Sequence, residues 1–370
     1  MRLSSRYSYC NTRIAALCMI IVVGIIWLMS SDESGAEISQ VWEKGHPLSV
    51  YRTAKGYITI SELEEKIFEP AGFVLTPESE NQVIPVLQPI EQPKCEKVFD
   101  AWQEAAEKGI STDSNPQHKL RAEYTLNGYT TMSECIMNEH FNNEPSYVEQ
   151  LSIKTMWSKG HIDSEVRKAK TKKFSKYSYK DSLAVYYATK FHSIKGMNGA
   201  VIGSQTPWVE VLCLANGAES LITVDYQKLH ITHPQIAFIH AMDVVKNREV
   251  YNDKFDFIVS FSSIEHSGLG RYGDPIDPFG DIKEMQKIRC MLKPGGLFFL
   301  GLPVGQDNVG WNCHRTYGRI RLAMMTAGFE IINVFYMNEK PIELKIEELE
   351  KEYYDPHVFI HYVFVLKKIY

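Results

Sequence analysis

Two kinds of hydrophobic pattern alternate along the second half of the chain. Short, nearly continuous apolar runs predict strands buried on both faces, and apolar residues three and four positions apart predict helices. In chain order these are a helix at 182–196, a strand at 200–203, a helix at 207–216, strands at 221–224, 235–242 and 255–262, a helix at 278–292 and a strand at 297–304. Strands and helices in this order indicate a doubly wound α/β domain with a mostly parallel sheet.

The end of the chain follows a different pattern. A helix at 317–329 is followed by strands at 330–337 and 357–368, with a charged, helix-like segment at 341–354 between them. Because no regular crossover helix joins these two strands, we expect an antiparallel C-terminal strand at the edge of the sheet.

An apolar run near the N-terminus predicts a membrane segment. Residues 14–29 carry no charge, two serines extend the run, and three arginines precede it. We therefore expect a cytosolic tail at 1–13 and a transmembrane signal anchor at 14–31, because the positive flank stays in the cytosol. The protein would then be a single-pass type II membrane protein of the endoplasmic reticulum or Golgi, with a lumenal C-terminal domain. The alternative is a signal peptide cleaved near 34–36, which would give a secreted protein.

The chain between the anchor and the α/β domain lacks sustained periodicity. Residues 32–94 carry scattered prolines and are expected to form a stem, and residues 95–180 form a helix-leaning extension. A basic stretch at 167–180 is typical of a solvated helix face or linker, with contact to a polyanion as the alternative. The α/β domain itself is expected at 181–370.

Charge and cysteine content narrow the classes of protein. The 370 residues carry a formal net charge of −5, so no global basic field exists and we expect no nucleic-acid partner. Two of the seven cysteines lie near the apolar run, and the other five show no C-x-x-C spacing, so we expect no metal site. Cys95 and Cys135 either form a disulfide in an oxidising lumen or are isolated small hydrophobic residues.

Polar residues follow several predicted strands, which is where ligands bind in open parallel sheets. Gly203 follows the first strand and Asp225 ends the second. A carboxylate in that position can accept both hydroxyls of a ribose, although it can also cap the next turn. The segment 262–281 is rich in glycine, proline and polar residues, so we expect it to line the mouth of an active site. Within it, His266 can act as a general base near neutral pH or simply hydrogen-bond within the loop.

These elements and residues resemble the class I S-adenosylmethionine-dependent methyltransferases over about 182–368. The segments that carry the resemblance are "GSQTPWVE", "LKPGGLFFLGLPV" and "HRTYGRIRLAMMTAGFEII". The chain is also similar to a family of nematode membrane-anchored proteins of unknown function. The resemblance implies a Rossmann-like fold and S-adenosylmethionine as cofactor. It places Gly203, Ser204 and Gln205 beneath the methionine part of the cofactor, Asp225 on the ribose, Asp243 near the adenine, and Ser262 and His266 beside the reacting methyl group.

The first loop departs from that family. Methyltransferases of this class usually have two or three glycines there, whereas this loop has only Gly203. The amide of Gln205 and the hydroxyl of Thr206 can hydrogen-bond the ends of the cofactor instead. Alternatively, Pro207 and Trp208 close the pocket.

The methyl acceptor is expected to contact the mouth of the site. Glu265 and Asp274 can bind acceptor hydroxyls, and His314 and Arg315 can hold an anionic acceptor. We therefore expect a methyltransferase that acts on a small molecule, lipid or glycan, with His266 as its catalytic base. The alternative is a non-catalytic binding module on the same fold, which the altered loop favours. An NAD-dependent enzyme is disfavoured because the G-x-G-x-x-G pattern is absent.

Overall fold

The computed structural model describes residues 48–107, 118–135, 152–174, 180–272, 274–353 and 359–369. Contacts divide the chain into two compact units, residues 1–50 and residues 51–370, and nearly all described residues belong to the second. The expected tail at 1–13 and anchor at 14–31 lie outside the described residues. Among the helices that are described, none combines the length and the apolar character that crossing a membrane requires.

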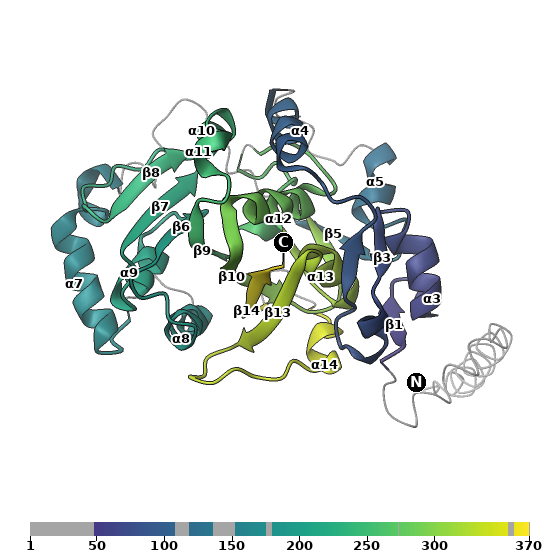
Figure 1. Ribbon diagram of the computed structural model, residues 1–370. Coiled ribbons are helices and arrows are strands. Elements are labelled where there is room, and N and C mark those ends of the chain that lie inside the picture. The colour runs from purple at the N-terminus through teal and green to yellow at the C-terminus, as the bar shows by residue number, and fades with distance from the viewer. Residues whose placement is uncertain are drawn as a thin grey trace, which may run out of the picture. The chain divides into compact units, whose positions relative to one another are not determined.

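A seven-stranded sheet forms the centre of the second unit (Figure 1), in the order β13-β14-β10-β9-β6-β7-β8. The strands are β6 (Asn198–Ile202), β7 (Ser220–Asp225), β8 (Ile236–His240), β9 (Phe255–Phe261), β10 (Leu292–Val304), β13 (Phe329–Phe335) and β14 (Ile360–Lys368). Strands β6 to β10 are parallel, and β14 runs antiparallel to both β10 and β13. The mostly parallel α/β sheet with an antiparallel C-terminal strand is confirmed. That strand lies inside the sheet, however, and β13 forms the edge.

Helices cover both faces of the sheet because neighbouring residues of the central strands point to opposite sides. Ala200, Ile258 and Phe298 belong to one buried cluster and Val201, Val259 and Phe299 to the other. The first cluster includes residues of α10 (Ala241–Lys246), α12 (Gly280–Met291) and α13 (Arg319–Thr326). The second includes residues of α7 (Lys159–Lys170), α8 (Leu183–Phe191) and α9 (Trp208–Ala215). The sheet is therefore doubly wound.

Residues before the sheet pack against it rather than standing apart. The pairs β1 (Val50–Thr53) with β2 (Gly56–Thr59) and β3 (Phe73–Leu75) with β4 (Leu87–Pro89) form two small sheets, followed by α4 (Cys95–Glu107) and α5 (His118–Tyr124). Leu63, Phe68 and Phe73 are buried in the first core cluster together with Phe99 of α4. The structure thus places the described residues 51–135, which span much of the expected stem and extension, in the same compact unit as the sheet.

A three-stranded sheet joins distant parts of the chain. Strand β5 (Thr131–Cys135) pairs in parallel with β11 (Asn308–Asn312), which pairs antiparallel with β12 (His314–Thr316). None of these three strands was expected from the hydrophobic pattern. The remaining short elements are α3 (Ile60–Leu63), α11 (Arg248–Tyr251), α14 (Ile346–Leu349), the π-helices Glu64–Phe68 and Ser152–Met156, and the 3-10 helices Pro77–Asn81, Lys180–Ser182 and Ile264–His266. Helix α14 is much shorter than the segment 341–354 predicted, and the buried apolar residues of that segment are Leu344, Ile346 and Leu349.

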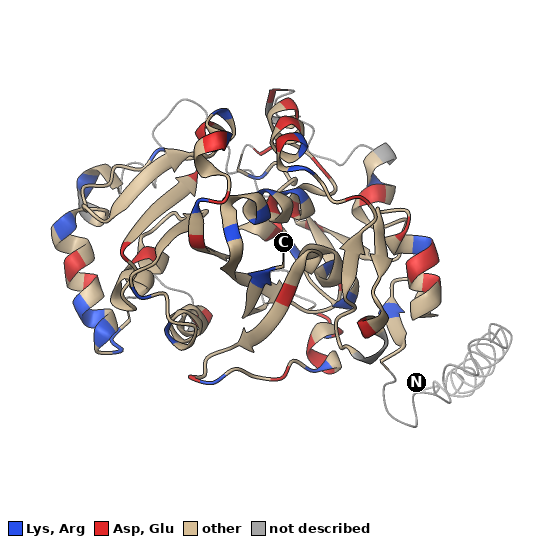
Figure 2. Ribbon diagram, in the orientation of Figure 1, with Lys and Arg blue, Asp and Glu red and all other residues tan. Residues whose placement is uncertain are grey.

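Two disulfides tie the N-terminal residues to the sheet. Cys95 pairs with Cys290 of α12, and Cys135 pairs with Cys313 in the turn between β11 and β12. The considered Cys95–Cys135 bridge is therefore wrong. Each cysteine of that pair instead bonds to a partner 195 or 178 residues along the chain. Acidic and basic side chains are spread over the helices rather than gathered at one place (Figure 2), apart from the cations in the last turn of α7.

Candidate functional site

A cavity of about 560 Å³ opens at the carboxyl ends of β6, β7 and β9. Strand β6 leads into α9 on one face of the sheet, whereas β9 leads into α12 on the other. The cavity therefore lies at the point where the winding direction reverses, which is the usual ligand-binding position in such sheets. Two groups of mutually contacting side chains line it. The α4 wall consists of Trp102, Tyr226 and Lys287, and the histidine wall consists of His266, Tyr272, His314 and Phe359.

The loop after β6 crosses directly above the start of the loop after β9. Gly203 has a φ of +70°, and a Cβ atom built there would lie 1.9 Å from Ser263 Oγ. Only glycine satisfies both the left-handed backbone and this close approach. Ser262 also has a positive φ, +51°, which is uncommon for a residue with a side chain. The two strand ends are thus pressed together beneath the cavity.

Asp225 ends β7 and faces the cavity. Its Oδ2 accepts a hydrogen bond from the Ser204 backbone N–H at 2.9 Å, and its Oδ1 accepts one from the Gln227 N–H at 2.7 Å. Burial raises the pKa of this carboxyl to about 6. A carboxylate offers about four lone-pair positions, so these bonds leave acceptor capacity for a ligand. The turn-capping role and the ligand-binding role considered for Asp225 are therefore compatible.

Glu210 supports this loop from below and was not expected from the sequence. It is fully buried in α9, accepts from Ser204 Oγ at 3.0 Å and from Thr223 Oγ1 at 2.8 Å. Burial raises its pKa to about 7. The indication in the sequence was a single acid in an otherwise apolar helix, because a buried acid needs hydrogen-bond partners.

His266 stands in the histidine wall with a defined tautomer. Its Nδ1 lies 2.5 Å from the carbonyl oxygen of Cys313 and must donate to it, which leaves Nε2 unprotonated in the neutral ring. Burial lowers the pKa of the ring, so the neutral form predominates at pH 7. The Cys135–Cys313 disulfide fixes the turn that carries this carbonyl. A neutral imidazole held in this way is suited to accept a proton.

A buried chain of charged groups begins beside Nε2 of His266. Glu265 Oε1 is 3.8 Å from Nε2 of His266 and 3.8 Å from Nε2 of His361, and His361 Nδ1 is 3.1 Å from Asp181 Oδ2. Burial alone would raise the pKa of Glu265, but His266 and His361 hold it at about 2. Burial alone would lower the pKa of His361, but Asp181 and Glu265 raise it to about 9. Neither His361 nor Asp181 was predicted to matter.

Buried charged side chains hold the loop after β9 in its shape. The Asp274 carboxylate accepts from the backbone N–H groups of Gly268, Gly270 and Tyr272, at 2.7, 3.0 and 3.2 Å. The fully buried Arg315 donates to the carbonyl oxygen of Ser267 at 2.6 Å and to three further carbonyls of the same loop. Both residues therefore shape the loop.

A second buried network anchors the end of that loop. Asp281 accepts from Arg321 Nε at 2.8 Å, from Arg321 Nη2 at 2.7 Å and from Tyr317 OH at 3.0 Å. Arg315 Nε lies 3.6 Å from the same carboxylate. One carboxylate thus faces two buried guanidinium groups. The loop of the histidine wall is thus held by buried charges as well as by the apolar packing of Ile264 and Leu269.

The structure brings most of the predicted residues to one place. Gly203, Ser204, Gln205, Asp225, Ser262, His266, Asp274 and His314 line the cavity, whereas Asp243, Glu265 and Arg315 do not. Asp243 lies in the first turn of α10, where its half-exposed side chain pairs with Lys246 at 3.4 Å. Its neighbour Ala241 lines the cavity instead, as does Trp102 of α4, which was not predicted.

Within the ranges that the structure describes, no group of three or more His, Cys, Asp or Glu side chains is arranged to hold a metal ion.

Comparison with solved structures gives distant matches to methyltransferases. A Streptococcus mutans chain assigned to the S-adenosylmethionine-dependent methyltransferases is 14% identical over 51% of this chain, with a TM-score of 0.34. This chain spans 49%, about half, of that protein. The 1,6-didemethyltoxoflavin-N1-methyltransferase of Burkholderia thailandensis, with bound 1,6-didemethyltoxoflavin and S-adenosylhomocysteine, is 12% identical over 63% of this chain and 94% of its own, with a TM-score of 0.36.

The N-methyltransferase NodS from Bradyrhizobium japonicum WM9, in complex with S-adenosylhomocysteine, is 13% identical over 57% of this chain and 97% of its own, with a TM-score of 0.36. No curated protein matches the chain. The model of a family described as "Caenorhabditis protein of unknown function, DUF268" matches residues 196–369, from the turn before β6 to the end of β14.

Proposed function

We propose that this chain is an S-adenosylmethionine-dependent methyltransferase that acts on a small-molecule, lipid or glycan acceptor. The observation that carries the proposal is the position of Asp225. Its ionisable carboxylate faces a cavity at the reversal point of the sheet, beside the tight crossing of Gly203 over Ser263. This is the arrangement that a ribose with an extended substituent requires.

The residues around Asp225 fit the cofactor. Gly203 lets the loop pass close to Ser263 at the cavity, and Gly203, Ser204 and Gln205 all line the cavity. Position 203 is where the backbone of this loop needs a glycine, and the loop has a glycine there. Asp225 would hold the ribose, and Ser204 and Gln205 would contact the methionine portion.

The cofactor supplies a methyl group activated by a sulfonium, which an acceptor displaces in line, so the protein mainly orients the two reactants. His266 would accept the proton of an acceptor hydroxyl or amine at Nε2, because Nδ1 is engaged with the Cys313 carbonyl. Depression of its pKa by burial keeps this base unprotonated at neutral pH. His314, Tyr272 and Phe359 would surround the acceptor.

The proposal includes a non-cytosolic location. Two disulfides favour an oxidising compartment, and they agree with a lumenal domain behind a type II anchor at 14–31. A lumenal methyltransferase requires S-adenosylmethionine to be imported into that compartment. A non-catalytic binding module is the second candidate, and the replacement of the other loop glycines by Gln205, Thr206 and Pro207 is the observation that favours it.

Calorimetric titration of the full chain, solubilised in detergent, with S-adenosylmethionine and S-adenosylhomocysteine tests the proposal. We expect both to bind, and Asp225→Ala to weaken binding by about 10- to 150-fold, because a charge-assisted hydrogen bond contributes about 1.5 to 3 kcal/mol. Asp243→Ala is the matched control, since its carboxylate lies outside the cavity lining, and it should bind like the wild type. Absence of binding by either compound would refute the proposal.

Binding alone does not separate an enzyme from a binding module. Transfer of a labelled methyl group from S-adenosylmethionine to small-molecule, lipid or glycan fractions makes that distinction. We expect transfer, and we expect His266→Gln to slow it by about 100-fold while leaving S-adenosylhomocysteine affinity unchanged. Tight cofactor binding without transfer to any fraction would favour the binding module.

A further inference from the structure

Helix α4 forms one wall of the cavity although it precedes the sheet by about 100 residues of chain. Val98 and Phe99 are buried in the core, while Ala101, Trp102 and Ala105 line the cavity. The helix contacts α12 and α10, which flank the carboxyl edge of the sheet (Figure 1). It lies outside residues 196–369, which the family model matches. The cavity is therefore completed by a part of the chain that belongs to neither the matched region nor the expected domain.

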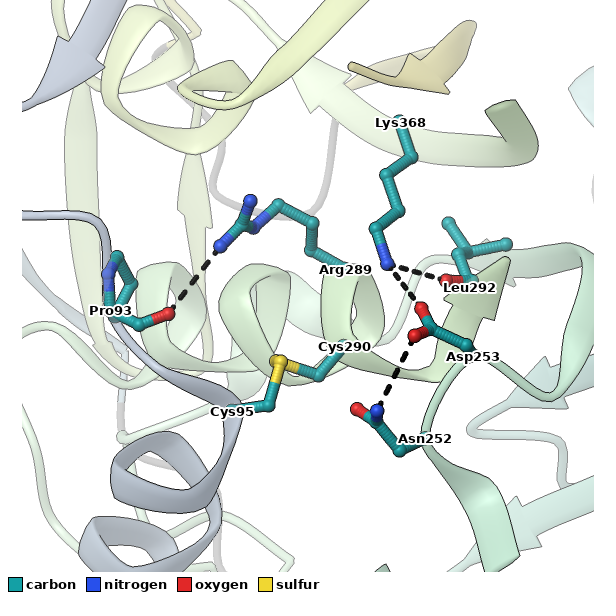
Figure 3. The surroundings of a disulfide bond; sticks show 8 residues. All are labelled: Pro93, Cys95, Asn252, Asp253, Arg289, Cys290, Leu292 and Lys368. Carbon is teal, nitrogen blue, oxygen red and sulfur yellow. Dashed lines mark hydrogen bonds and ion pairs between the residues drawn. A yellow bond between two sulfur atoms is a disulfide. The ribbon is translucent and has the colours of Figure 1, made fainter. Parts of the chain in front are cut away.

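Several bonds fix α4 in this position. The first residue of the helix, Cys95, forms the disulfide with Cys290 of α12 (Figure 3). The neighbouring Arg289 donates to the carbonyl oxygen of Pro93 at 3.5 Å (Figure 3). One turn further along α4, Asp100 pairs with Arg248 of α11. Helix α4 is thus bonded to α12 and to α11.

Trp102 presents its ring to the cavity from this helix. Its centroid lies 6.2 Å from that of Tyr226, with the planes at 65°. Lys287 Nζ sits 3.7 Å from the indole centroid, and it pairs with Glu284 at 2.6 Å. The other residues of α4 that line the cavity, Ala101 and Ala105, are small. The result is a flat aromatic surface with a cation on one side.

Tyr226 directly follows Asp225 in the chain, which places the aromatic pair beside the carboxylate assigned to the ribose. A nucleobase is attached to the ribose, so it must lie within a few ångströms of that carboxylate. Aromatic side chains bind bases by stacking, because every base has a flat π surface. By contrast, the Asp243 carboxylate is half-exposed and outside the cavity lining.

We propose that the α4 wall is the binding site for the purine ring of an adenine nucleoside, with Trp102 as its principal contact. The inference rests on the proposed function for the ribose assignment of Asp225. The Cys95–Cys290 disulfide holds Trp102 in the binding position before the ligand arrives, so binding does not have to order the helix. The α/β domain at 181–370 is therefore an incomplete binding site by itself.

Two probes, adenosine and S-adenosylhomocysteine, test this assignment by calorimetry on the full chain. Trp102→Ala should weaken the binding of both by about 5- to 150-fold, the range for loss of one stacking contact. Trp102→Phe should restore most of the affinity. Gln103→Ala is the matched control, because its side chain bonds only to Glu107 on the exposed side of the same helix, and it should bind both probes normally.

The disulfides provide a second comparison. The double variant Cys95→Ser with Cys290→Ser should weaken adenosine binding, whereas Cys135→Ser with Cys313→Ser should not, because that bridge serves the histidine wall. Each variant is first checked by thermal unfolding.

The outcomes separate this inference from the proposed function. Unchanged affinity of a folded Trp102→Ala variant for both probes overturns the inference and leaves the proposed function standing. Binding of adenosine through Trp102, without binding of S-adenosylhomocysteine, supports the purine site and refutes the methyltransferase. Failure of the wild type to bind either probe overturns both.

Discussion

The α4 wall and the histidine wall face the same cavity but are built by different physical means. The α4 wall presents two aromatic rings and one buried cation to the cavity, and its helix is held by a disulfide, an exposed ion pair and two buried apolar side chains. The histidine wall is a loop whose shape depends on buried charges, among them Asp281, Arg315 and His361. The first is suited to bind a flat apolar ring, and the second to hold a base at a defined tautomer and position.

The two walls should therefore respond differently to substitutions and to pH. Apolar contacts are lost in small increments, whereas a buried charge that loses its partner is left uncompensated. The histidine wall should therefore be fragile and sensitive to alkali, and the α4 wall tolerant but dependent on its covalent tie. Two experiments test the histidine wall, and a third tests Asp225 at the same cavity.

The largest expected effect is on the buried ions of the histidine wall. Asp281→Ala removes the carboxylate that faces Arg315 and Arg321, so two buried guanidinium groups lose their counterion. We expect the free energy of unfolding to fall by about 3–5 kcal/mol in denaturant titrations. Glu339→Ala, which breaks the exposed pair with Lys172, should cause no measurable change. Equal effects of the two variants would remove the distinction between the walls.

His361 should make the protein lose stability in alkali. Its pKa is raised to about 9 by Asp181 and Glu265 against the effect of burial, while an unfolded histidine titrates near 6.5. The stabilisation is therefore complete below about pH 6.5 and is lost as the pH rises through about 9, by roughly 3 kcal/mol in all. Unfolding measured at several pH values should show this decline in the wild type, and His361→Gln should flatten it. A wild-type stability that is constant from pH 7 to 9 would contradict the assignment.

Asp225 should give ligand binding the opposite pH dependence. Burial raises its pKa to about 6, so acid protonates the carboxylate in the folded protein before ligand binds. The affinity for S-adenosylhomocysteine should then fall by up to about tenfold per pH unit below about pH 6. Because the folded state takes up this proton more readily than the unfolded chain, Asp225 itself does not destabilise the fold over the same range. Calorimetry of Asp225→Asn should show an affinity that no longer changes with pH between 5 and 7.

The sheet was predictable from the sequence because its strands follow a strong local pattern. Strand β9, for example, is buried along nearly its whole length, and its apolar run is long enough to predict a strand. Strand β11 has no such local pattern. Its sequence, NVGWN, contains polar residues and a glycine, and it forms a strand because β5 pairs with it from a distant part of the chain. Local composition contains no information on that partner.

Some residues of the candidate site were predictable from the sequence, and others were not. Gly203, Asp225 and His266 were predictable because each follows a strand end, and strand ends meet at one edge of a parallel sheet. Trp102 was not, because its place in the cavity depends on how α4 packs and on the Cys95–Cys290 bond. Disulfide connectivity cannot be deduced from spacing alone. The buried places of Glu265 and Arg315 outside the cavity lining were not predictable for a related reason, since sequence does not show whether a charged side chain faces a cavity or the protein interior.

The Cys95–Cys290 bond cannot form until Cys290 has been synthesised, long after Cys95. Synthesis proceeds at roughly 5–20 residues per second, and the partners are 195 residues apart, so Cys95 is exposed for roughly 10–40 seconds before Cys290 is made. During that interval Cys135 is already present and much nearer. Each doubling of loop length adds about 0.6 kcal/mol to the entropic cost of closure, so the shorter non-native loop is favoured early. If that bridge forms first, it must open by thiol–disulfide exchange before Cys95 can bond to Cys290 and fix α4 at the cavity.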